Sequence, residues 1–328
     1  MDRFLSVLKR PNKLQDRTEG TRQSLMWYLT STRGQIKLLH VFAVSYVIIF
    51  CFLVCWASVT LGLPVVLQDS PTLLTCSQGL MIYLCFCIEA NFLLIKYRAK
   101  DSHVLESSYG LLPMKHMNKV KQVEQYACNK SSNGTVESDW RICSHCNVQV
   151  PPRARHCSIC QTCVLKKDHH CFFTGCCIGF YNQRYFITFC VLGMVGGSWG
   201  LYNLGTYLST HYAAFFSLQI YKYFLPYMVL SALLGYQSFY ELFLVMLFFC
   251  HITSTATSYY YFVWQMCIIQ RGQTSYEYMT NIRIYEPNFW SGMKSVFGPY
   301  WLAGFFVPIP FIVNEGDGKS WMSKTKSM

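Results

Sequence analysis

Twelve residues near the middle of the chain, KKDHHCFFTGCC at positions 166–177, contain three cysteines and two histidines. The stretch from 143 to 177 holds eight of the 17 cysteines and four of the nine histidines. Thiolates and imidazoles bind soft metal ions, and they also act as nucleophiles and bases. Disulfides are rare in reducing compartments, so metal binding or catalysis is favoured for this cluster.

The spacing of these residues indicates zinc. Three C-x2-C steps occur, and the full order is Cys143, Cys146, His156, Cys157, Cys160, Cys163, Asp168, His169, His170, Cys171 and Cys177. A C-x2-C step is typical of tetrahedral zinc sites, because a tight turn points both sulfurs at one ion. The intervening residues are polar and too few to build an apolar core, so zinc would supply the folding free energy.

The cluster contains more donors than zinc needs. Eight cysteines and four histidines exceed the eight ligands that two tetrahedral ions take. A nucleophilic cysteine must be free of metal, and the adjacent Asp168 and His169 could activate one, with histidine as base and the carboxylate as its orienting partner. Spacing alone does not say which cysteine is free.

The elements that must hold this cluster are membrane helices. The chain is 52% hydrophobic and only 13% charged, against about 25% charged in soluble domains. Four segments reach the roughly 20 apolar residues that cross a bilayer: Leu38–Leu63, Thr72–Ile95, Tyr185–Leu208 and Glu241–Ile269. We therefore predict four transmembrane helices, with the cluster between the second and third. The glycines of the third span predict close helix contact.

Several shorter segments complete the predicted organisation. Phe224–Tyr236 is apolar but short, which indicates a luminal or re-entrant piece. Phe297–Val313 contains three prolines, which favours an interfacial segment. Residues 1–35 and 314–328 are predicted to be mobile tails. We detect no internal repeat, and the polar N-terminus argues against a cleavable signal peptide.

Charge orients the predicted helices. All lysines and arginines except Lys222 lie in residues 1–37, 96–184 or beyond 270. The positive-inside rule then predicts cytosolic termini and a cytosolic loop at 96–184, so the sequons at Asn129 and Asn133 should carry no glycan. The net charge of +12 suits an anionic leaflet or an anionic substrate. A nucleic-acid partner is not expected, because the basic residues flank the spans and form no separate domain.

The cysteine-rich region resembles that of the DHHC family of protein S-acyltransferases. The family pattern is C-x2-C-x9-H-C-x2-C-x2-C-x4-D-H-H-C-x5-C-x4-N-x3-F, and every element is present here, ending in Cys177, Asn182 and Phe186. After the last span, QTSYE resembles the TTxE motif of the family through Thr274 and Glu277. NFWSGMKSVFG (288–298) resembles its C-terminal asparagine/aromatic motif.

The resemblance implies two structural zinc ions. One would be held by Cys143, Cys146, His156 and Cys163, and the other by Cys157, Cys160, His170 and Cys177. Cys171 would then be the nucleophile, which attacks a long-chain acyl-CoA such as palmitoyl-CoA, forms an acyl-enzyme and passes the acyl group to a substrate cysteine. His169 would be its base and Asp168 the residue that orients His169.

The same resemblance implies the architecture and the partners. The fold would be an α-helical integral membrane protein with a small two-zinc domain at about 141–186, between spans at 38–95 and 185–269 and followed by a cytosolic region at 270–328. The expected partners are the lipid bilayer, acyl-CoA and membrane-associated proteins with cytosolic cysteines. An endomembrane location, Golgi or ER, is expected over the plasma membrane.

The sequence departs from the family at positions near the proposed nucleophile. Most members have Pro-Trp after the motif cysteine, where this chain has Phe172 and Phe173, and Ser275 replaces the second threonine of TTxE. A catalytically silent zinc-binding membrane scaffold therefore remains an alternative. A RING-type ubiquitin ligase is disfavoured, because His156-Cys157 reverses the RING order. Cys176 is expected to be a packed thiol or, alternatively, a second acyl acceptor. His145 is expected to be a solvated neighbour of the zinc ligands and not a ligand itself.

Overall fold

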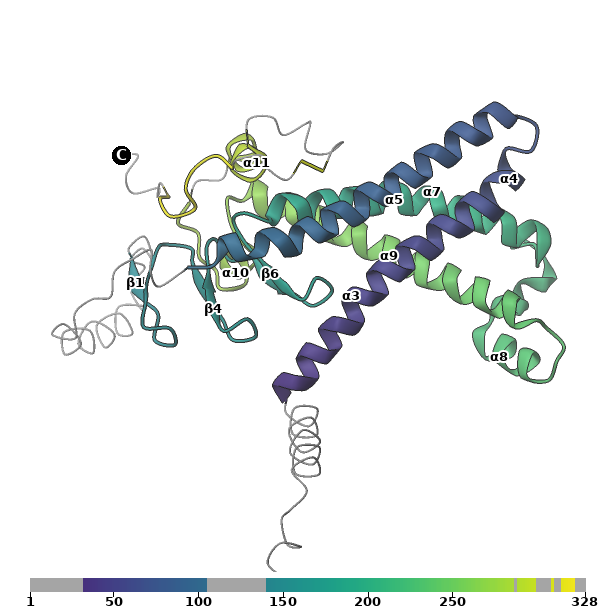
Figure 1. Ribbon diagram of the computed structural model, residues 1–328, viewed down its shortest axis with the longest axis horizontal. Coiled ribbons are helices and arrows are strands. Elements are labelled where there is room, and N and C mark those ends of the chain that lie inside the picture. The colour runs from purple at the N-terminus through teal and green to yellow at the C-terminus, as the bar shows by residue number, and fades with distance from the viewer. Residues whose placement is uncertain (1–31, 105–139, 286–287, 299–307, 310–313, 322–328) are drawn as a thin grey trace, which may run out of the picture.

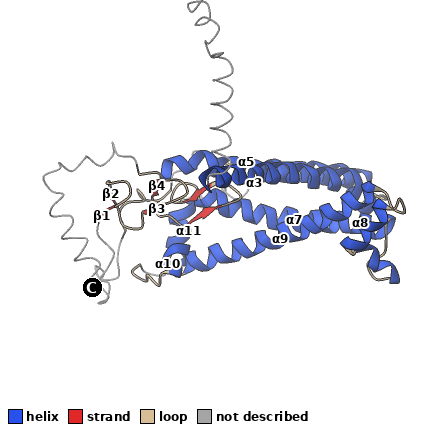
Figure 2. Ribbon diagram, turned by 90° about the horizontal axis from the view of Figure 1, so that it is seen from below, coloured by secondary structure: helices blue, strands red, loops and turns tan. Residues whose placement is uncertain are grey.

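The computed structural model describes residues 32–104, 140–285, 288–298, 308–309 and 314–321 (Figure 1). The two sequons and most of the segment predicted to be interfacial lie outside the described residues. The described part of the chain is mostly helical, with a cysteine-rich region of short hairpins at one end of a helix bundle (Figure 2).

Within the described residues, four helices are long and apolar enough to cross a membrane: Gly34–Val66, Pro71–Ser102, Gln183–His211 and Phe239–Gln270. This confirms the predicted number, with ends that differ from the predicted spans by a few residues. In chain order they comprise α3 (Thr32–Ala57) with the π-helical turn η1 (Ser58–Gly62) and α4 (Leu63–Val66), α5 (Pro71–Ala99) with the 3-10 turn η2 (Lys100–Ser102), α7 (Gln183–His211) and α9 (Phe239–Gln270).

The bundle is tightest where α7 meets α9. A Cβ at Gly197 would lie 2.6 Å from the Oγ1 of Thr255, and one at Gly193 would lie 2.7 Å from the Oγ of Ser258. Any side chain at these glycines would push the helices apart, so the close contact predicted for the third span is confirmed. By contrast, α3 crosses the bundle obliquely and its first half leaves it (Figure 1).

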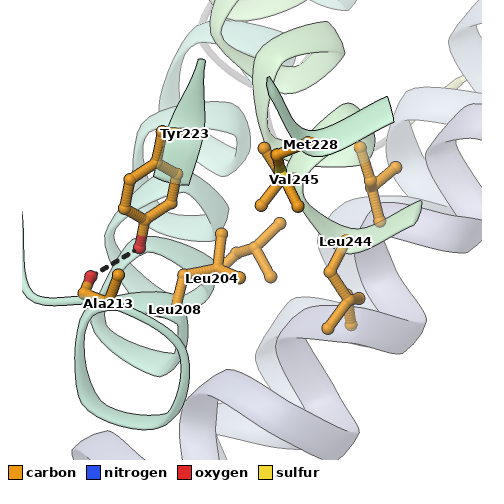
Figure 3. Packing of buried hydrophobic residues seen from close by; sticks show 9 residues of the cluster. Leu204, Leu208, Ala213, Tyr223, Met228, Leu244 and Val245 are labelled. Atoms are coloured by element: carbon orange, nitrogen blue, oxygen red, sulfur yellow. Dashed lines mark hydrogen bonds between the residues drawn. The ribbon is translucent and has the colours of Figure 1, made fainter. Parts of the chain in front are cut away.

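The end of the bundle far from the hairpins is closed by the connection between α7 and α9. This connection contains the 3-10 turn η5 (Leu218–Tyr223) and α8 (Leu225–Leu233), which is too short to cross a membrane. Figure 3 shows Met228 of α8 packed with Leu204 and Leu244, while the hydroxyl of Tyr223 donates a 2.7 Å hydrogen bond to the carbonyl of Ala213. The apolar segment at 224–236 thus covers one end of the bundle.

The cysteine-rich region consists of three antiparallel hairpins. They pair β1 (Arg141–Ile142) with β2 (Gln149–Val150), β3 (Arg155–Cys157) with β4 (Thr162–Val164), and β5 (His169–Cys171) with β6 (Cys176–Ile178). Strands of two or three residues cannot form an extensive sheet. Beside the hairpins lie α10 (Ser275–Met279) and α11 (Phe289–Phe297), which is capped by the side chain of Asn288.

These hairpins repeat with a period that the sequence analysis did not detect. His156 pairs with Cys163, and 14 positions later His170 pairs with Cys177. In each turn a backbone N–H bonds the carbonyl of a cysteine four residues earlier: Asn147 to Cys143, Gln161 to Cys157 and Gly175 to Cys171. All three donor residues have positive φ. The absence of a repeat was therefore a wrong prediction, because the 14-residue units share few residues besides their cysteines and histidines.

The predicted tails are also corrected. Helix α3 begins at Thr32, inside the predicted N-terminal tail. The segment Asn314–Trp321 packs on the hairpin region, because buried Asn314 accepts a 2.6 Å hydrogen bond from Arg184 and donates one to the carbonyl of Phe180. Buried polar contacts of this kind fix a segment whose composition alone looks disordered.

Candidate active site and metal centres

Two groups of Cys and His side chains come together between the hairpins. The first contains Cys143, Cys146, His156 and Cys163, and the second contains Cys157, Cys160, His170 and Cys177. Within each group all ligand atoms lie within 4.8 Å of one another. The structure thus brings together the two quartets predicted from the resemblance, and both could hold a metal ion.

The distances within the groups fit tetrahedral zinc. Zn–S and Zn–N bonds of about 2.3 and 2.0 Å place neighbouring ligand atoms roughly 3.4–3.8 Å apart. In the second group the Nδ1 of His170 lies 3.3 Å from the Sγ of Cys160 and 3.6 Å from that of Cys177. In the first group the Nδ1 of His156 lies 3.3 Å from the Sγ of Cys146. Three thiols and one imidazole are a structural zinc donor set.

The repeat explains which cysteine is left over. Each group takes two cysteines from the turn of one hairpin and a facing His–Cys pair from the next hairpin. Cys171 occupies in the third turn the position that Cys143 and Cys157 occupy in the first two. Thr174 stands where a second cysteine would be, and no further hairpin follows among the described residues up to Trp321. Cys171 therefore has the backbone setting of a zinc ligand without belonging to either group.

The residues beside Cys171 form a buried acid–imidazole–thiol array. The Nδ1 of His169 lies 2.8 Å from the Oδ2 of Asp168, and the side chains of His169 and Cys171 interact directly. His169 also meets the ring of Phe186 edge to face at 5.2 Å. Asp168 and Cys171 are buried, while His169 is partly exposed.

Asp168 is held by groups from the last long helix and from α10. Its carboxylate accepts hydrogen bonds from the Nε2 of Gln265 at 2.8 Å, from the backbone N–H of Ser275 at 2.6 Å and from the Ser275 hydroxyl at 3.1 Å. Gln265 is in turn bonded to Gln183 at 2.9 Å. A carboxylate with several donors stays ionised and keeps a fixed orientation.

The electrostatics favour a proton on His169. Burial alone would lower the pKa of His169, but its hydrogen bonds to Asp168 and Cys171 outweigh burial and raise that pKa to about 9. Burial would raise the pKa of the Cys171 thiol, but the contact with His169 outweighs it, so the pKa lies below its ordinary value. Both directions favour a thiolate facing an imidazolium.

Comparison with known proteins agrees with this geometry. Residues 136–282 match the model of the DHHC palmitoyltransferase family. This range is similar to a DHHC palmitoyltransferase domain. A search among curated proteins gave no match. The matched range runs from just before the first hairpin to just after α10, so it includes both metal groups, the Asp168–His169–Cys171 array and the TSYE segment.

The TSYE segment of the matched range shows why serine serves at position 275. Ser275 supplies to Asp168 a backbone N–H and a hydroxyl, both of which threonine would also supply. Thr274 caps α10, with its hydroxyl accepting from the backbone N–H of Glu277. Glu277 forms a buried bidentate ion pair with Arg153, at 2.7 and 2.6 Å. The segment thereby ties the connection between the first two hairpins to the Asp168 network.

Asn182 of the family pattern and Lys96 of α5 fix the third hairpin. The side chain of Asn182 accepts from the backbone N–H of Gly179 and donates to the carbonyls of Cys177 and Ile95. The ammonium group of Lys96 donates a 2.9 Å hydrogen bond to the carbonyl of Thr174 at the hairpin tip. The last turns of α5 therefore hold both ends of the hairpin that carries Cys171.

Sequence reasoning missed the contributions of Gln265 and Gln183. Both amides are buried, and both lie at the hairpin ends of apolar helices. The only signal in the sequence was that each is an uncharged polar residue in an apolar helix. Such a residue is a candidate for a functional role, but the sequence does not show which residue it bonds to. His145 stacks on His156 with ring centroids 4.6 Å apart and belongs to neither metal group, as predicted. Cys176 is partly buried beside Thr174, also as predicted.

A mostly apolar cavity of about 330 Å³ opens beside Cys171 and runs between the four long helices. Cys171 and Phe173 line one end, and His251 lines the other, with Gly193 and Gly197 in the wall between them. Along α9 the lining extends from Tyr261 to His251, which is about 15 Å of helix. For comparison, a cavity of about 150 Å³ holds benzene.

Proposed function

We propose that this chain is a protein S-acyltransferase that carries a long-chain acyl group, such as palmitoyl, from acyl-CoA to cysteine thiols of membrane-associated proteins. The observation that carries the proposal is a thiol with an acid–imidazole pair, Cys171 with His169 and Asp168, placed at the mouth of a long apolar cavity. The family whose model the chain matches supports the same reaction class.

Two transfers make up the proposed reaction. The Cys171 thiolate attacks the thioester carbonyl of acyl-CoA, the new S–C bond forms, the bond to the CoA sulfur breaks, and the proton held by His169 goes to the leaving CoA thiolate. His169 then accepts the proton of a substrate cysteine, whose sulfur takes the acyl group and releases Cys171. Asp168 keeps the ring of His169 oriented in both transfers.

In this proposal the two Cys/His groups bind structural zinc. Each hairpin has two short strands and little apolar core, so zinc would supply folding free energy to the region. The chain's own contribution is geometric. Ligands His170 and Cys177 face each other in the hairpin that carries Cys171, so a fixed second group would also fix the backbone of the nucleophile.

The apolar cavity is the proposed site of the acyl chain. An extended chain built of ~1.5 Å bonds advances roughly 1.3 Å per carbon, so a depth of about 15 Å takes roughly 12 carbons beyond the thioester. Burying these carbons in the cavity removes apolar surface from water. Each buried CH₂ contributes about 0.8 kcal/mol of favourable free energy. The chain end would then lie near His251.

We also propose that the hairpin end of the bundle faces the cytosol in a Golgi or ER membrane. The support is the distribution of basic residues, of which Lys222 alone lies in a connection at the other end. Reporter tags at both termini should be accessible from the cytosolic side. A glycan on Asn129 or Asn133 would place the thiol in the wrong compartment and overturn the orientation.

The proposal is tested by incubating the purified full chain with labelled palmitoyl-CoA. An acyltransferase takes up a label that neutral hydroxylamine removes and releases an equivalent amount of CoA. A silent zinc-binding scaffold would remain zinc-loaded and folded but take up no label. Zinc content and circular dichroism of the same sample distinguish that result from a misfolded preparation.

A further inference from the structure

The second nitrogen of a metal-group histidine contacts the first membrane helix. The Nδ1 of His170 faces the sulfurs of Cys157, Cys160 and Cys177 at 3.3–3.6 Å. Its Nε2 points the other way and lies 3.3 Å from the Nε2 of His40 in α3. The two rings are 5.1 Å apart between centroids.

The metal group settles which nitrogen donates. An imidazole that binds a metal through Nδ1 carries its proton on Nε2, so His170 can only donate to its neighbour. The Nε2 of His40 must then be a lone-pair acceptor, and the proton of a neutral His40 resides on Nδ1. Metal-bound histidines commonly donate their outer N–H to such a partner, which fixes the orientation of the ring.

Other contacts place His40 against the same hairpin. Its ring meets that of Phe172 edge to face at 5.5 Å. A Cβ added at Gly175, at the hairpin tip, would lie 3.3 Å from the Cβ of His40. The third hairpin therefore fits closely around His40. Its strand β5 contains both His170, which contacts His40, and Cys171.

Several neighbours of His40 on α3 face away from the protein. Leu39, Val41 and Phe42, which flank His40, are more than half exposed in the described structure. Tyr46 makes a 3.4 Å hydrogen bond to Ser254 two turns further along. The contact at His40 therefore links the first half of α3 to the hairpins.

We propose that His40 is a positioning residue that accepts the outer N–H of the metal ligand His170 and so couples the first membrane helix to the hairpin of Cys171. Loss of the acceptor leaves a part-buried N–H of His170 unpaired and frees the ring of His170 to rotate. The inference rests on the proposed zinc centre, and it adds a residue outside the cysteine-rich region to that centre.

The test compares variants of the full chain that keep or remove the acceptor. His40→Phe keeps a ring against Phe172 and Gly175 but cannot accept, whereas His40→Gln retains an acceptor oxygen. Leu39→Ala, at the neighbouring exposed position, is the control. The readout is the rate at which zinc passes to a chromogenic chelator, with zinc content determined beforehand. Removing a partner of this kind typically costs about 10–100-fold in metal affinity.

We expect His40→Phe to release one of two zinc ions about 10–100-fold faster than the unaltered chain. The second ion of this variant should leave at the original rate. In His40→Gln and Leu39→Ala both ions should leave at nearly the original rate. Equal release from His40→Phe and the unaltered chain overturns the role of His40, as does equal acceleration of both ions. Should His40→Phe not fold, His40→Leu takes its place. An unaltered, folded chain without zinc instead refutes the zinc centre itself.

Discussion

Ser275 illustrates how a departure from a family pattern can preserve its chemistry. The residue bonds Asp168 through its backbone and its hydroxyl, and the hydroxyl also accepts from the indole N–H of Trp264 at 2.8 Å. Replacing threonine by serine removes only a methyl group. The sequence alone made this position look like a weakened motif, because the role of the hydroxyl becomes visible only from its partner 107 positions away.

Ser275→Ala should slow acylation of Cys171 while leaving zinc content unchanged. The variant retains the backbone N–H but loses a hydrogen bond to a charged group, which is worth about 1.5–3 kcal/mol. If the whole of that free energy is lost from the transition state through a displaced His169, acylation slows roughly 10- to 100-fold. Ser275→Thr is the matched control and should acylate at nearly the original rate. Equal rates for Ser275→Ala and Ser275→Thr would show that the hydroxyl contributes nothing.

Thr174 distinguishes the third hairpin from the two whose turns provide metal ligands. Thr174→Cys restores a C-x2-C step and places a third thiol near Cys171 and Cys176, since the Sγ of Cys176 lies 3.4 Å from the Oγ1 of Thr174. We expect this variant to bind an additional equivalent of Zn²⁺ or Cd²⁺ and to lose acylation, because a metal-bound thiolate is a poor nucleophile. Thr174→Ser should do neither. Unchanged metal content in Thr174→Cys contradicts the equivalence of the three turns.

At the scale of elements, α10 depends on a buried ion pair. Arg153 and Glu277 are almost fully inaccessible, and the guanidinium also lies over the rings of Tyr285 and Trp321 at 4.3 and 4.6 Å. This arrangement joins the hairpin region, α10 and the C-terminal segment. The motif predicted that Glu277 matters, but the chain offered no signal for the segment that supplies Trp321.

Glu277→Gln should destabilise the protein strongly. Breaking a buried ion pair leaves the other charge unpaired, at a cost of about 3–5 kcal/mol. Asp101→Asn is the matched control, because the Asp101–Arg98 pair is partly exposed and worth about 0–1 kcal/mol. The free energy of unfolding in mixed micelles measures both. Similar losses for the two variants would mean that Arg153 and Glu277 do not form the pair described.

The cavity between the helices predicts selectivity for acyl length. Cys51 lines the cavity at middle depth on α3, whereas Cys76 is exposed on α5 and lies outside it. Cys51→Phe should shift the preferred acyl-CoA to chains a few carbons shorter, because the ring occupies space that the chain end needs. Cys76→Phe should leave the preference unchanged. Competition among acyl-CoAs of different lengths measures the shift, and identical profiles would place the chain elsewhere.

At the scale of the whole molecule, the sequence predicted the features that depend on residues close together in the chain. Hydropathy located four long helices within a few residues, C-x2-C spacing indicated zinc, and the family resemblance implied two quartets that the structure brings together. The contacts that join these parts were not predictable, because His40 and His170 are 130 positions apart and Gln265 and Asp168 are 97 apart. Single polar residues in apolar helices reveal their purpose only through such partners.

The assembled molecule places one thiol at the junction of the metal-binding hairpins and the apolar cavity. Eight cysteines lie in the hairpin region, and Cys176 and Cys190 are close enough to Cys171 to influence its environment. The account assigns the acyl group to Cys171 alone. It also separates Cys171 from its neighbour His170, whose loss would disturb metal binding and folding.

The most direct test is to locate the acyl group by mass spectrometry of peptides from the full chain, quenched after brief exposure to palmitoyl-CoA. The account predicts a hydroxylamine-sensitive palmitoyl group on Cys171. It also predicts that Cys171→Ser retains two zinc ions and acquires no acyl group, because a neutral hydroxyl attacks a thioester poorly. A palmitoyl group on Cys176 or Cys190 in the unaltered chain, or continued labelling of Cys171→Ser, would contradict it.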